Sequence, residues 1–320
     1  MEISKYSKIV IDEAKKMGIK SEQIGDDGLM FLLKKGKKET LIYQSLTELI
    51  SNTIYLITAN KYLTHLYFKK YGFPVPHAQY IKNKADAYEF LKKYKKVVVK
   101  PLAGNRGIGI TVGIKSQKGL RRAIEFALEM SPKSKTKKGF KLLVEEAVPG
   151  YDNRILVIDY KHVFSIKKLP ANITGDGKSS MKKLIDNKNL EVVKHKSPII
   201  IDDYLRHILF RQGMTLRGVP AKGEKVFVRR TANLATGGES IDITDELNED
   251  VKKMAIKAAK AFKMPVAGFD YMTRDHTGNE GYFIEVNPIP GFLIHHYPHF
   301  GKERNPTKEM LKLLIKKKLL

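Results

Sequence analysis

The sequence contains no cysteine, and this absence limits the chemistry open to the protein. It excludes a disulfide framework, a thiolate metal site and a cysteine nucleophile. No apolar run approaches the roughly 18 residues that a membrane-spanning helix needs. The N-terminal stretch "MEISKYSKIVIDEAKKMGIK" is charged throughout and lacks the apolar centre of a signal peptide. These absences predict a cytoplasmic protein that is not inserted in a membrane.

Acidic residues are scarce relative to basic ones. The 320 residues include 59 Lys and Arg but only 34 Asp and Glu, which gives a formal net charge of +25 at pH 7. This excess favours an anionic partner, such as a nucleic acid, a nucleotide or an acidic substrate. It is also the composition of a lysine-rich solvated surface, and many lysines stand in pairs, as in "LKKYKK" and "LKLLIKKKLL". No motif interleaves aromatic with basic residues, so nucleic acid is the less favoured partner.

The pattern of apolar residues predicts helices and strands along most of the chain, which we divide into three parts, residues 1–75, 76–148 and 149–320. The first part is a small α/β unit that ends where glycine and two prolines in "GFPVP" forbid further helix. The expected helices cover 9–17, 46–72, 85–94, 117–130, 179–185 and 251–262. The expected strands cover 29–33, 40–44, 78–81, 96–101, 141–148, 154–159, 162–168, 266–272 and 281–287.

The stretch "VVVKPLAGNRGIGITV", residues 97–112, joins a strand of the buried type to a glycine-rich loop. Lys100 ends the strand, and an unpaired lysine there would be costly to bury, so it favours an anionic partner. Glycines in the loop allow positive φ, and exposed N–H groups form a nest for phosphate oxygens. The alternative is an ordinary turn between two strands. The glycines are Gly104, Gly107 and Gly109.

Two familiar phosphate motifs are absent. The loop lacks the GK[ST] ending of a Walker A loop, and Val112 stands at the third-glycine position of the dinucleotide fingerprint. In "NITGDGKSS", Gly177, Lys178 and Ser179 could end a Walker A loop, but Asn172 stands where its first glycine is required.

The best metal candidate lies near the C-terminus. Asp270 lies in the apolar strand "VAGFDYM", and Glu285 and Asn287 share one face of the next strand, "YFIEVN". If the two strands form a hairpin, Asp270 can reach the same point. Two carboxylates and an amide oxygen are hard ligands, suited to Mg²⁺ held together with substrate phosphates. The alternative is a set of polar strand-end residues that point to solvent.

"VRRTANLATGGES" places Arg229 and Asn233 shortly before two glycines. Arginine is suited to bidentate contact with a phosphate or carboxylate. The alternative is a surface turn with solvated arginines. The pair His295 and His296 is more typical of a structural role than of a catalytic one, and no Ser/His/Asp order with a nucleophile elbow is visible.

Taken together, the motifs resemble the ATP-grasp superfamily, and within it the ATP-grasp module of cyanophycin synthetases and bifunctional glutathione synthases. The resemblance runs from about residue 9 to residue 296. Its landmarks are "NKYLTHLYFKKYGFPVP", "VVVKPLAGNRGIGI", "LLVEEAVPGYDNRILV", "LPANITGDGKSSMKKLI", "VRRTANLATGGESIDITDEL", "GFDYM" and "IEVNPIPGFLIHHYP". The resemblance implies an ATP-grasp fold, in which two α+β subdomains grip ATP between them.

The resemblance also implies a role for each matching position. The residues that would contact ATP are Lys61, Lys100, Gly104, Arg106, Gly107, Gly109, Glu145, Glu146, Val148 and Asp152. Those matching the family's magnesium ligands are Asp270, Glu285 and Asn287, for a pair of Mg²⁺ ions that Mn²⁺ can replace. Arg229 and Asn233 would face the transferring phosphoryl group. The substrate side would be lined by Arg154, Lys168 and His295.

The implied activity is that of an ATP-dependent carboxylate–amine ligase that works through an acyl phosphate. The resemblance implies a carboxylate and an amine, from an amino acid, a short peptide or an acidic polymer, with segments 104–109 and 171–180 as lids. A homodimer is common among relatives. Two alternatives are an ATP-grasp kinase acting on a small molecule and a non-catalytic nucleotide- or nucleic-acid-binding protein.

The chain also departs from these relatives. We expect their additional catalytic domain to be absent, in which case their substrates cannot be carried over. Lys168 stands where relatives often have arginine, and bidentate geometry would be lost there.

Overall fold

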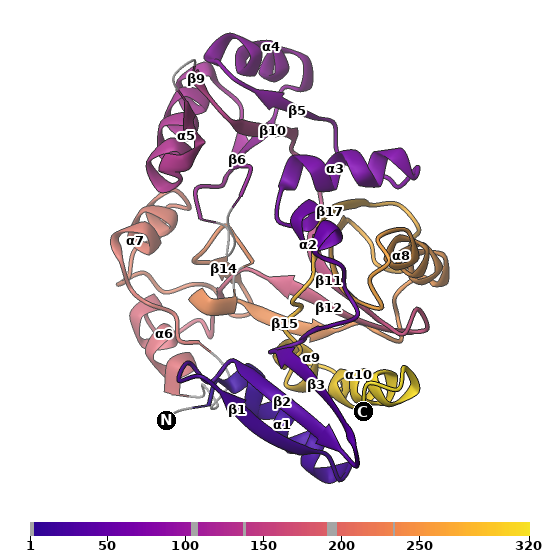
Figure 1. The fold of residues 1–320 in the computed structure, drawn as a ribbon. Helices are drawn as coiled ribbons and strands as arrows, with labels where there is room; N and C mark the ends of the chain where they lie inside the picture. Colours follow the sequence, from indigo (N-terminus) through magenta and orange to yellow (C-terminus); the bar gives the residue numbers. More distant parts are fainter. Residues whose placement is uncertain (1–2, 104–107, 137–138, 191–196, 233) are drawn as a thin grey trace.

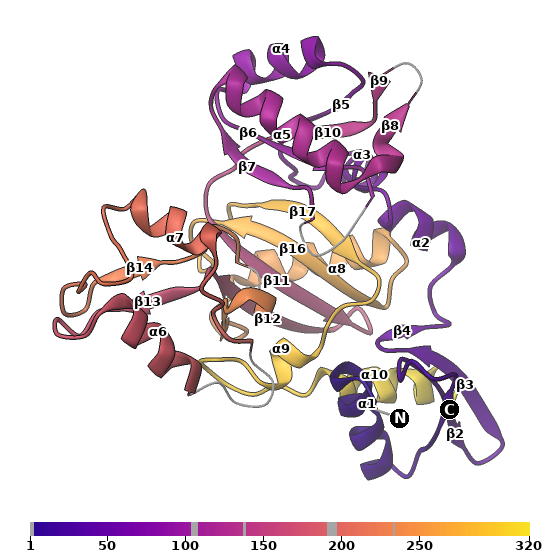
Figure 2. The ribbon, with the colours of Figure 1, turned by 90° about the vertical axis from the view of Figure 1, so that its left-hand side faces the viewer.

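The computed structural model describes the whole chain except residues 1–2, 104–107, 137–138, 191–196 and 233. Helices and strands are mixed along the chain, and the strands run antiparallel to their neighbours within each sheet, consistent with the predicted α+β class. A five-stranded sheet lies in the middle, with one four-stranded sheet above it and another below (Figures 1 and 2). Within the described residues, no helix has the length and apolar character needed to cross a bilayer.

The N-terminal sheet packs against both ends of the chain. Its strands, in order, are β1 (Lys20–Ile24), β2 (Met30–Lys35), β3 (Lys38–Tyr43) and β4 (Leu46–Thr47). Helix α1 (Lys5–Lys16) buries its apolar stripe against this sheet and against α10 (Pro306–Lys316). The stripe includes Ile9 and Ala14, as its helical spacing predicts. Residues close to the two termini therefore share one core.

The expected single helix over 46–72 is wrong. After β4 the chain forms two helices, α2 (Asn52–Thr58) and α3 (Lys61–Lys70). The side chains of Ser51 and Asn60 accept backbone N–H groups of the residues that follow them, so each caps a new helix. The apolar pattern runs through both helices, which hides the break between them.

The second sheet is covered by two helices on one face. Its strands, in order, are β5 (Ala78–Ile81), β10 (Leu142–Glu146), β6 (Val97–Pro101) and β7 (Thr111–Ile114). The helices are α4 (Lys84–Tyr94) and α5 (Gln117–Met130), and the bounds of α5 are those predicted. A short hairpin, β8 (Lys135–Thr136) and β9 (Gly139–Phe140), follows the 3₁₀ turn η1 (Pro132–Ser134).

The central sheet carries most of the candidate site. Its strands, in order, are β15 (Glu239–Asp242), β12 (His162–Leu169), β11 (Tyr151–Ile158), β16 (Val266–Thr273) and β17 (Tyr282–Asn287). Helices α3 and α8 (Glu249–Ala261) share an aromatic core with it, in which the Phe68 and Phe283 rings stack with centroids 5.1 Å apart. Two short elements, η2 (Leu234–Thr236) and α9 (Leu293–His296), lie beside the sheet (Figure 2).

A smaller module projects from the central sheet (Figure 2). It pairs β13 (Asn172–Thr174) with β14 (Lys225–Phe227) and adds α6 (Met181–Leu190) and α7 (Asp203–Phe210). Its own apolar core includes Met181, Leu205 and Leu209.

Gly150 precedes β11, the strand that carries Asp152 and Arg154, and we expect Gly150→Ala to be destabilising. Its φ is +127°, and a Cβ there would collide with the backbone of Thr273. The free energy of unfolding should fall by about 2 kcal/mol, measured by urea denaturation. Gly213→Ala is the matched control, because Gly213 also has positive φ (+69°) but no heavy atom within 4 Å of the added Cβ. Equal losses in the two variants would show that the collision contributes nothing.

Candidate active site

The hairpin predicted for the two C-terminal strands is confirmed. In the β16–β17 pairing, Asp270 lies opposite Glu285, and Asn287 lies opposite Gly268. The Asn287 side-chain nitrogen is 3.5 Å from Asp270 Oδ2. The pairing shifts register directly after Asp270, which is a β-bulge of the kind that redirects side chains. The three residues proposed as metal ligands therefore lie together.

Two basic side chains, one from β11 and one from β12, contact Asp270. Arg154 on β11 lies opposite it in the sheet, and Arg154 Nε is 2.9 Å from Asp270 Oδ1. Lys168 on β12 bonds the same oxygen at 3.1 Å and Asp152 Oδ2 at 2.8 Å. Strand register sets these contacts, because Asp152 lies opposite Lys168 in the β11–β12 pairing. Acidic and basic side chains from β12, β11 and β16 therefore lie next to one another at this point of the sheet.

These surroundings shift the pKa values of Asp270 and Asp152 in opposite directions. Burial alone would raise the pKa of Asp270, but the charges of Arg154 and Lys168 outweigh it and hold that pKa well below its ordinary value. Burial raises the pKa of Asp152 in spite of Lys168, and its Oδ1 is buried without a hydrogen-bond partner among the described residues. Asp270 therefore stays ionised at neutral pH, whereas the charge on Asp152 is disfavoured.

The donor set suits Mg²⁺ bound jointly with a phosphate. Across the described ranges, no three His, Asp or Glu side chains come close enough to hold a metal ion by themselves. Two carboxylates and one amide from Asp270, Glu285 and Asn287 fit an ion that keeps waters and phosphate oxygens as its other ligands. Arg154 and Lys168 both contact Oδ1 of Asp270, and neither ion pair involves its Oδ2.

Lys61 contacts both a proposed metal ligand and the chain directly after a strand of the second sheet. Its Nζ is 3.0 Å from Glu285 Oε1, and its backbone N–H donates to the carbonyl of Leu102, just past β6, at 2.9 Å. The cap on α3 places Lys61 as the first helical residue. Lys61 therefore contacts both Glu285 on β17 and Leu102 directly after β6.

Lys100 is buried and has an acidic partner. Its side chain is 9% exposed and pairs with Glu145 on β10, which is 7% exposed. The two strands are antiparallel with Lys100 opposite Leu143, so Glu145 is its diagonal neighbour. The prediction that Lys100 binds an anion agrees with this environment, although the anion here is a protein carboxylate. A phosphate role for Lys100 stays a prediction.

Of the remaining residues predicted to contact the nucleotide, the structure describes Gly109, Glu146 and Val148. Gly109 has φ +74°, and a Cβ there would lie 2.9 Å from the Pro101 side chain, so glycine is required by a close approach. Glu146 and Val148 lie at and just after the end of β10, where the Glu146 N–H donates to the His77 carbonyl at 2.8 Å. Gly104, Arg106 and Gly107 lie outside the described residues.

Arg229 is buried but is bound within the module. Its guanidinium forms a bidentate pair with Asp202, both distances being 2.9 Å, and donates to the Ile200 carbonyl at 2.8 Å. Among the described residues, its hydrogen bonds do not reach the acids of β16 and β17. Its catalytic role stays a prediction, and Asn233 lies outside the described residues. Asp202 also caps α7, a signal visible in the sequence, but nothing local links it to Arg229.

We expect Asp202→Asn to lower stability in a pH-dependent way. Burial would raise the pKa of Asp202, but the Leu205 N–H and the Arg229 charge outweigh it and lower that pKa. A lowered folded-state pKa contributes stability above the unfolded-state pKa and loses it as pH falls through the folded-state value. Asparagine keeps the cap and removes the charge. Because Asp202 is 47% exposed, the loss at pH 7 should be only about 0.5–1 kcal/mol.

Thermal unfolding of the wild type and Asp202→Asn at pH 7 and at about pH 3 measures this effect. The difference in melting temperature should shrink on acidification. A difference that is unchanged at low pH would mean that the ion pair with Arg229 contributes nothing. Asp186→Asn, which breaks an exposed ion pair with Lys182 on α6, is the control and should have little effect at either pH.

His295 is completely buried on α9 beside Phe164, with ring centroids 6.3 Å apart. Neither ring nitrogen has a hydrogen-bond partner among the described residues. Burial and the charge of Arg154 hold the pKa of His295 well below its ordinary value, so the ring is neutral. A buried imidazole with two unsatisfied nitrogens is costly, so we expect an ordered water or a bound ligand to complete its bonding; a substrate-side role for His295 stays a prediction.

Comparison with known proteins decides the family. Residues 63–228 match the family model for the ATP-grasp domain of prokaryotic glutathione synthetase. The chain belongs to the ATP-grasp superfamily. It is 32% identical, over 98% of its length, to the glutathione biosynthesis bifunctional protein of Enterococcus faecalis, and 30% identical, over 96%, to the cyanophycin synthetase of a Nostoc species.

A solved structure agrees with the ATP-grasp assignment. The bifunctional glutathione synthetase of Pasteurella multocida superposes with a TM-score of 0.75 at 26% identity and covers 99% of this chain. The chain spans 42% and 34% of the two curated relatives and 44% of that structure. The similarity therefore concerns one part of each longer relative.

Proposed function

We propose that the protein is an ATP-dependent carboxylate–amine ligase that forms an amide through an acyl phosphate. The observation that supports this proposal is the placement of Asp270 opposite Glu285, with Arg154 and Lys168 on Asp270 and Lys61 on Glu285. Such a cluster, in a member of the ATP-grasp superfamily, suits phosphoryl transfer, where catalysis is mainly positioning and charge neutralisation.

The reaction balances in two steps. A substrate carboxylate oxygen attacks the γ-phosphorus of ATP, the bond to the β-phosphate oxygen breaks, and ADP leaves. The amine nitrogen of a second substrate then attacks the acyl carbon, loses a proton, and displaces phosphate to leave an amide. A carboxylate is a poor electrophile on its own, which is why the phosphoryl group is needed. Exclusion of water from the acyl phosphate is essential, because water would hydrolyse it.

The metal and phosphate roles follow from charge. Asp270, Glu285 and Asn287 would hold a pair of Mg²⁺ ions, which Mn²⁺ can replace and which would supply neutralisation of phosphate charge. Lys61 and Lys100 would turn from their carboxylate partners toward phosphate oxygens. Both lysines are at most 9% exposed, so their charges act with little screening by solvent.

The other assigned residues divide between nucleotide and substrates. Nucleotide contacts are assigned to Gly109, Glu145, Glu146, Val148 and Asp152, and to the undescribed Gly104, Arg106 and Gly107. Arg154 and Lys168 would bind the substrate carboxylate, and the neutral ring of His295 offers one donor and one acceptor. Arg229 and the undescribed Asn233 would act near the transferring phosphoryl group. The parts 1–75, 76–148 and 149–320 remain the proposed domains.

A product screen tests the proposal. ADP release is measured over amino acids and short acidic peptides, singly and in pairs, and products are identified by mass spectrometry. We expect ADP release that requires both a carboxylate and an amine, with an amide product. ADP release with a phosphorylated product and no amide would instead favour a kinase. Nucleotide binding without ADP release from any pair would overturn the catalytic proposal.

A further inference from the structure

A cationic hollow lies on the projecting module, and none of the residues assigned above to metal or nucleotide lines it. It has a volume of about 570 Å³, within the range of ligand pockets. We name it the α6–α7 hollow, because its lining includes Lys182 on α6 and Arg206 on α7. Its lining residues are Ser180, Lys182, Ile201, Arg206, Leu216 and Arg217.

The walls of the α6–α7 hollow are held by backbone hydrogen bonds. The N–H groups of Met181 and Lys182 donate to the carbonyls of Gly218 and Leu216, each at 2.9 Å. The Met214 N–H donates to the Leu209 carbonyl at 3.0 Å, which fastens the same loop to α7. The hollow is therefore formed before any ligand arrives, which lowers the entropy cost of binding.

The positive charges of the two arginines that line the hollow are not neutralised by acidic residues in the described part of the chain. Lys182 pairs with Asp186 at 2.7 Å, but neither Arg206 nor Arg217 has an acidic partner among the described residues. The first N–H groups of α6 are already bonded to the loop, so the positive potential comes from side chains. Arginine presents a planar fork of donors that matches a carboxylate.

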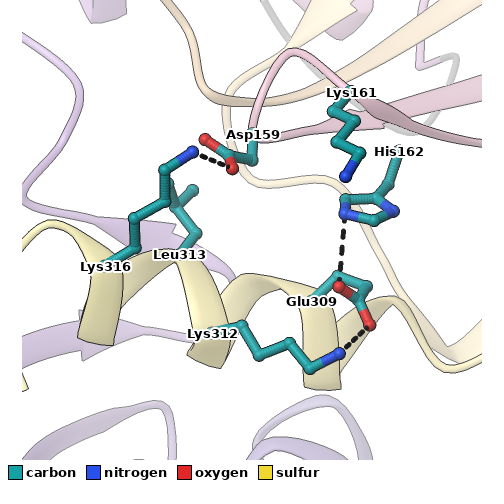
Figure 3. Close-up of a pocket in the computed structure, with 7 residues that line it drawn as sticks. All are labelled: Asp159, Lys161, His162, Glu309, Lys312, Leu313 and Lys316. Atoms are coloured by element: carbon teal, nitrogen blue, oxygen red, sulfur yellow. Dashed lines mark hydrogen bonds and ion pairs between the residues drawn. The ribbon is translucent and has the colours of Figure 1, made fainter.

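A second hollow, of about 350 Å³, provides a contrast (Figure 3). Its basic residues other than Lys161 face acids that lie in the same hollow. Lys316 pairs with Asp159 at 2.6 Å, and Glu309 pairs with Lys312 at 2.9 Å and with His162 at 3.3 Å. Charges that are largely neutralised within the hollow give an anion little to gain, so basic residues lining a hollow do not by themselves indicate a ligand.

We propose that the α6–α7 hollow is a binding site for acidic peptides. Two unbalanced arginines would take peptide carboxylates, and the aliphatic side chains of Ile201 and Leu216 would contact the methylene groups between them. A single-stranded nucleic acid is disfavoured, because the hollow has no aromatic lining residue on which bases could stack. The proposal does not depend on the ligase reaction.

The test is binding of a fluorescent oligoglutamate to the full-length protein, followed by anisotropy without nucleotide. We expect Arg206→Glu/Arg217→Glu to weaken binding by about tenfold or more at physiological ionic strength. Arg121→Glu/Arg122→Glu on α5 is the control, since it changes net charge equally at exposed residues outside the hollow and should weaken binding by less than about twofold. Arg206→Gln/Arg217→Gln, a milder change, should lie between them.

Three results would overturn the proposal. The first is equal weakening by Arg206→Glu/Arg217→Glu and by the control Arg121→Glu/Arg122→Glu, which would indicate attraction to net charge alone. The second is tighter binding of a single-stranded oligonucleotide of matching charge that is lost with the hollow variants. The third is no binding of oligoglutamate by the wild type. Circular dichroism on each variant establishes that it is folded, and ligase activity has no part in the measurement.

Discussion

Asp270→Asn is expected to lower the rate of ADP release by about a thousandfold or more at saturating substrates and Mg²⁺. The change removes one of the two carboxylates proposed to hold the metal. It also removes the negative charge that Arg154 and Lys168 both contact. The rate is measured with a coupled ADP assay as a function of Mg²⁺ concentration.

The same variant should also be less stable. Two cations that are 15% and 11% exposed would lose their shared partner, which should lower the free energy of unfolding by about 2 kcal/mol. Glu285→Gln should reduce ADP release similarly, with a comparable or smaller loss of stability, because among the described residues Glu285 forms an ion pair with Lys61 alone. Loss of activity without unfolding in either variant separates the chemical effect from the structural one.

Asp275→Asn provides a matched control in the same hairpin. Asp275 is an exposed acid in the turn between β16 and β17, and its Oδ1 accepts the Thr277 N–H at 2.9 Å, which asparagine can also do. Its ADP release should stay within about twofold of the wild type. Full activity of Asp270→Asn would refute the metal assignment, whatever its stability.

Lys100→Met is expected to weaken nucleotide binding by about tenfold to a hundredfold. A phosphate would lose a charge-assisted hydrogen bond from a lysine that is shielded from solvent. The protein should also lose about 3 kcal/mol of stability, because Glu145 would remain buried without a partner. Binding is measured by calorimetry with ATP or a non-hydrolysable analogue, and stability by urea denaturation.

The double variant Lys100→Met/Glu145→Gln separates these two effects. Removing both charges should restore most of the lost stability, since no buried charge is left unpaired. Nucleotide affinity should stay low, because the cation that would meet the phosphates is still absent. Recovery of affinity together with stability would mean that Lys100 supports the fold and does not contact the nucleotide.

Local patterns were sufficient for elements whose pattern is regular. Helix α5 has the predicted bounds because its apolar residues keep one face over the whole helix. Strands β16 and β17 follow from short apolar runs that flank a turn of polar residues. The 46–72 segment failed because Ser51 and Asn60 interrupt a continuous apolar pattern, and a cap changes the backbone without changing hydrophobicity.

The sequence predicted which residues belong to the candidate site, but not which of them contact one another. Motifs that resemble the ATP-grasp superfamily named Lys61, Asp270 and Glu285 from residue type and order. They did not indicate that Lys61 pairs with Glu285, 224 positions along the chain. They likewise did not indicate that the guanidinium of Arg229, whose phosphoryl-side role stays a prediction, binds Asp202 at the N-cap of α7.

The sequence by itself determined the α+β class, the helices and strands with regular patterns, the absence of thiol chemistry and the superfamily. These depend on residue type and on spacing within a few turns of chain. Only the tertiary structure decided which acid meets which base, that α10 packs on α1, and that Arg206 and Arg217 line one hollow. Such contacts join residues far apart in sequence, and their energy depends on burial and distance, which no local pattern records.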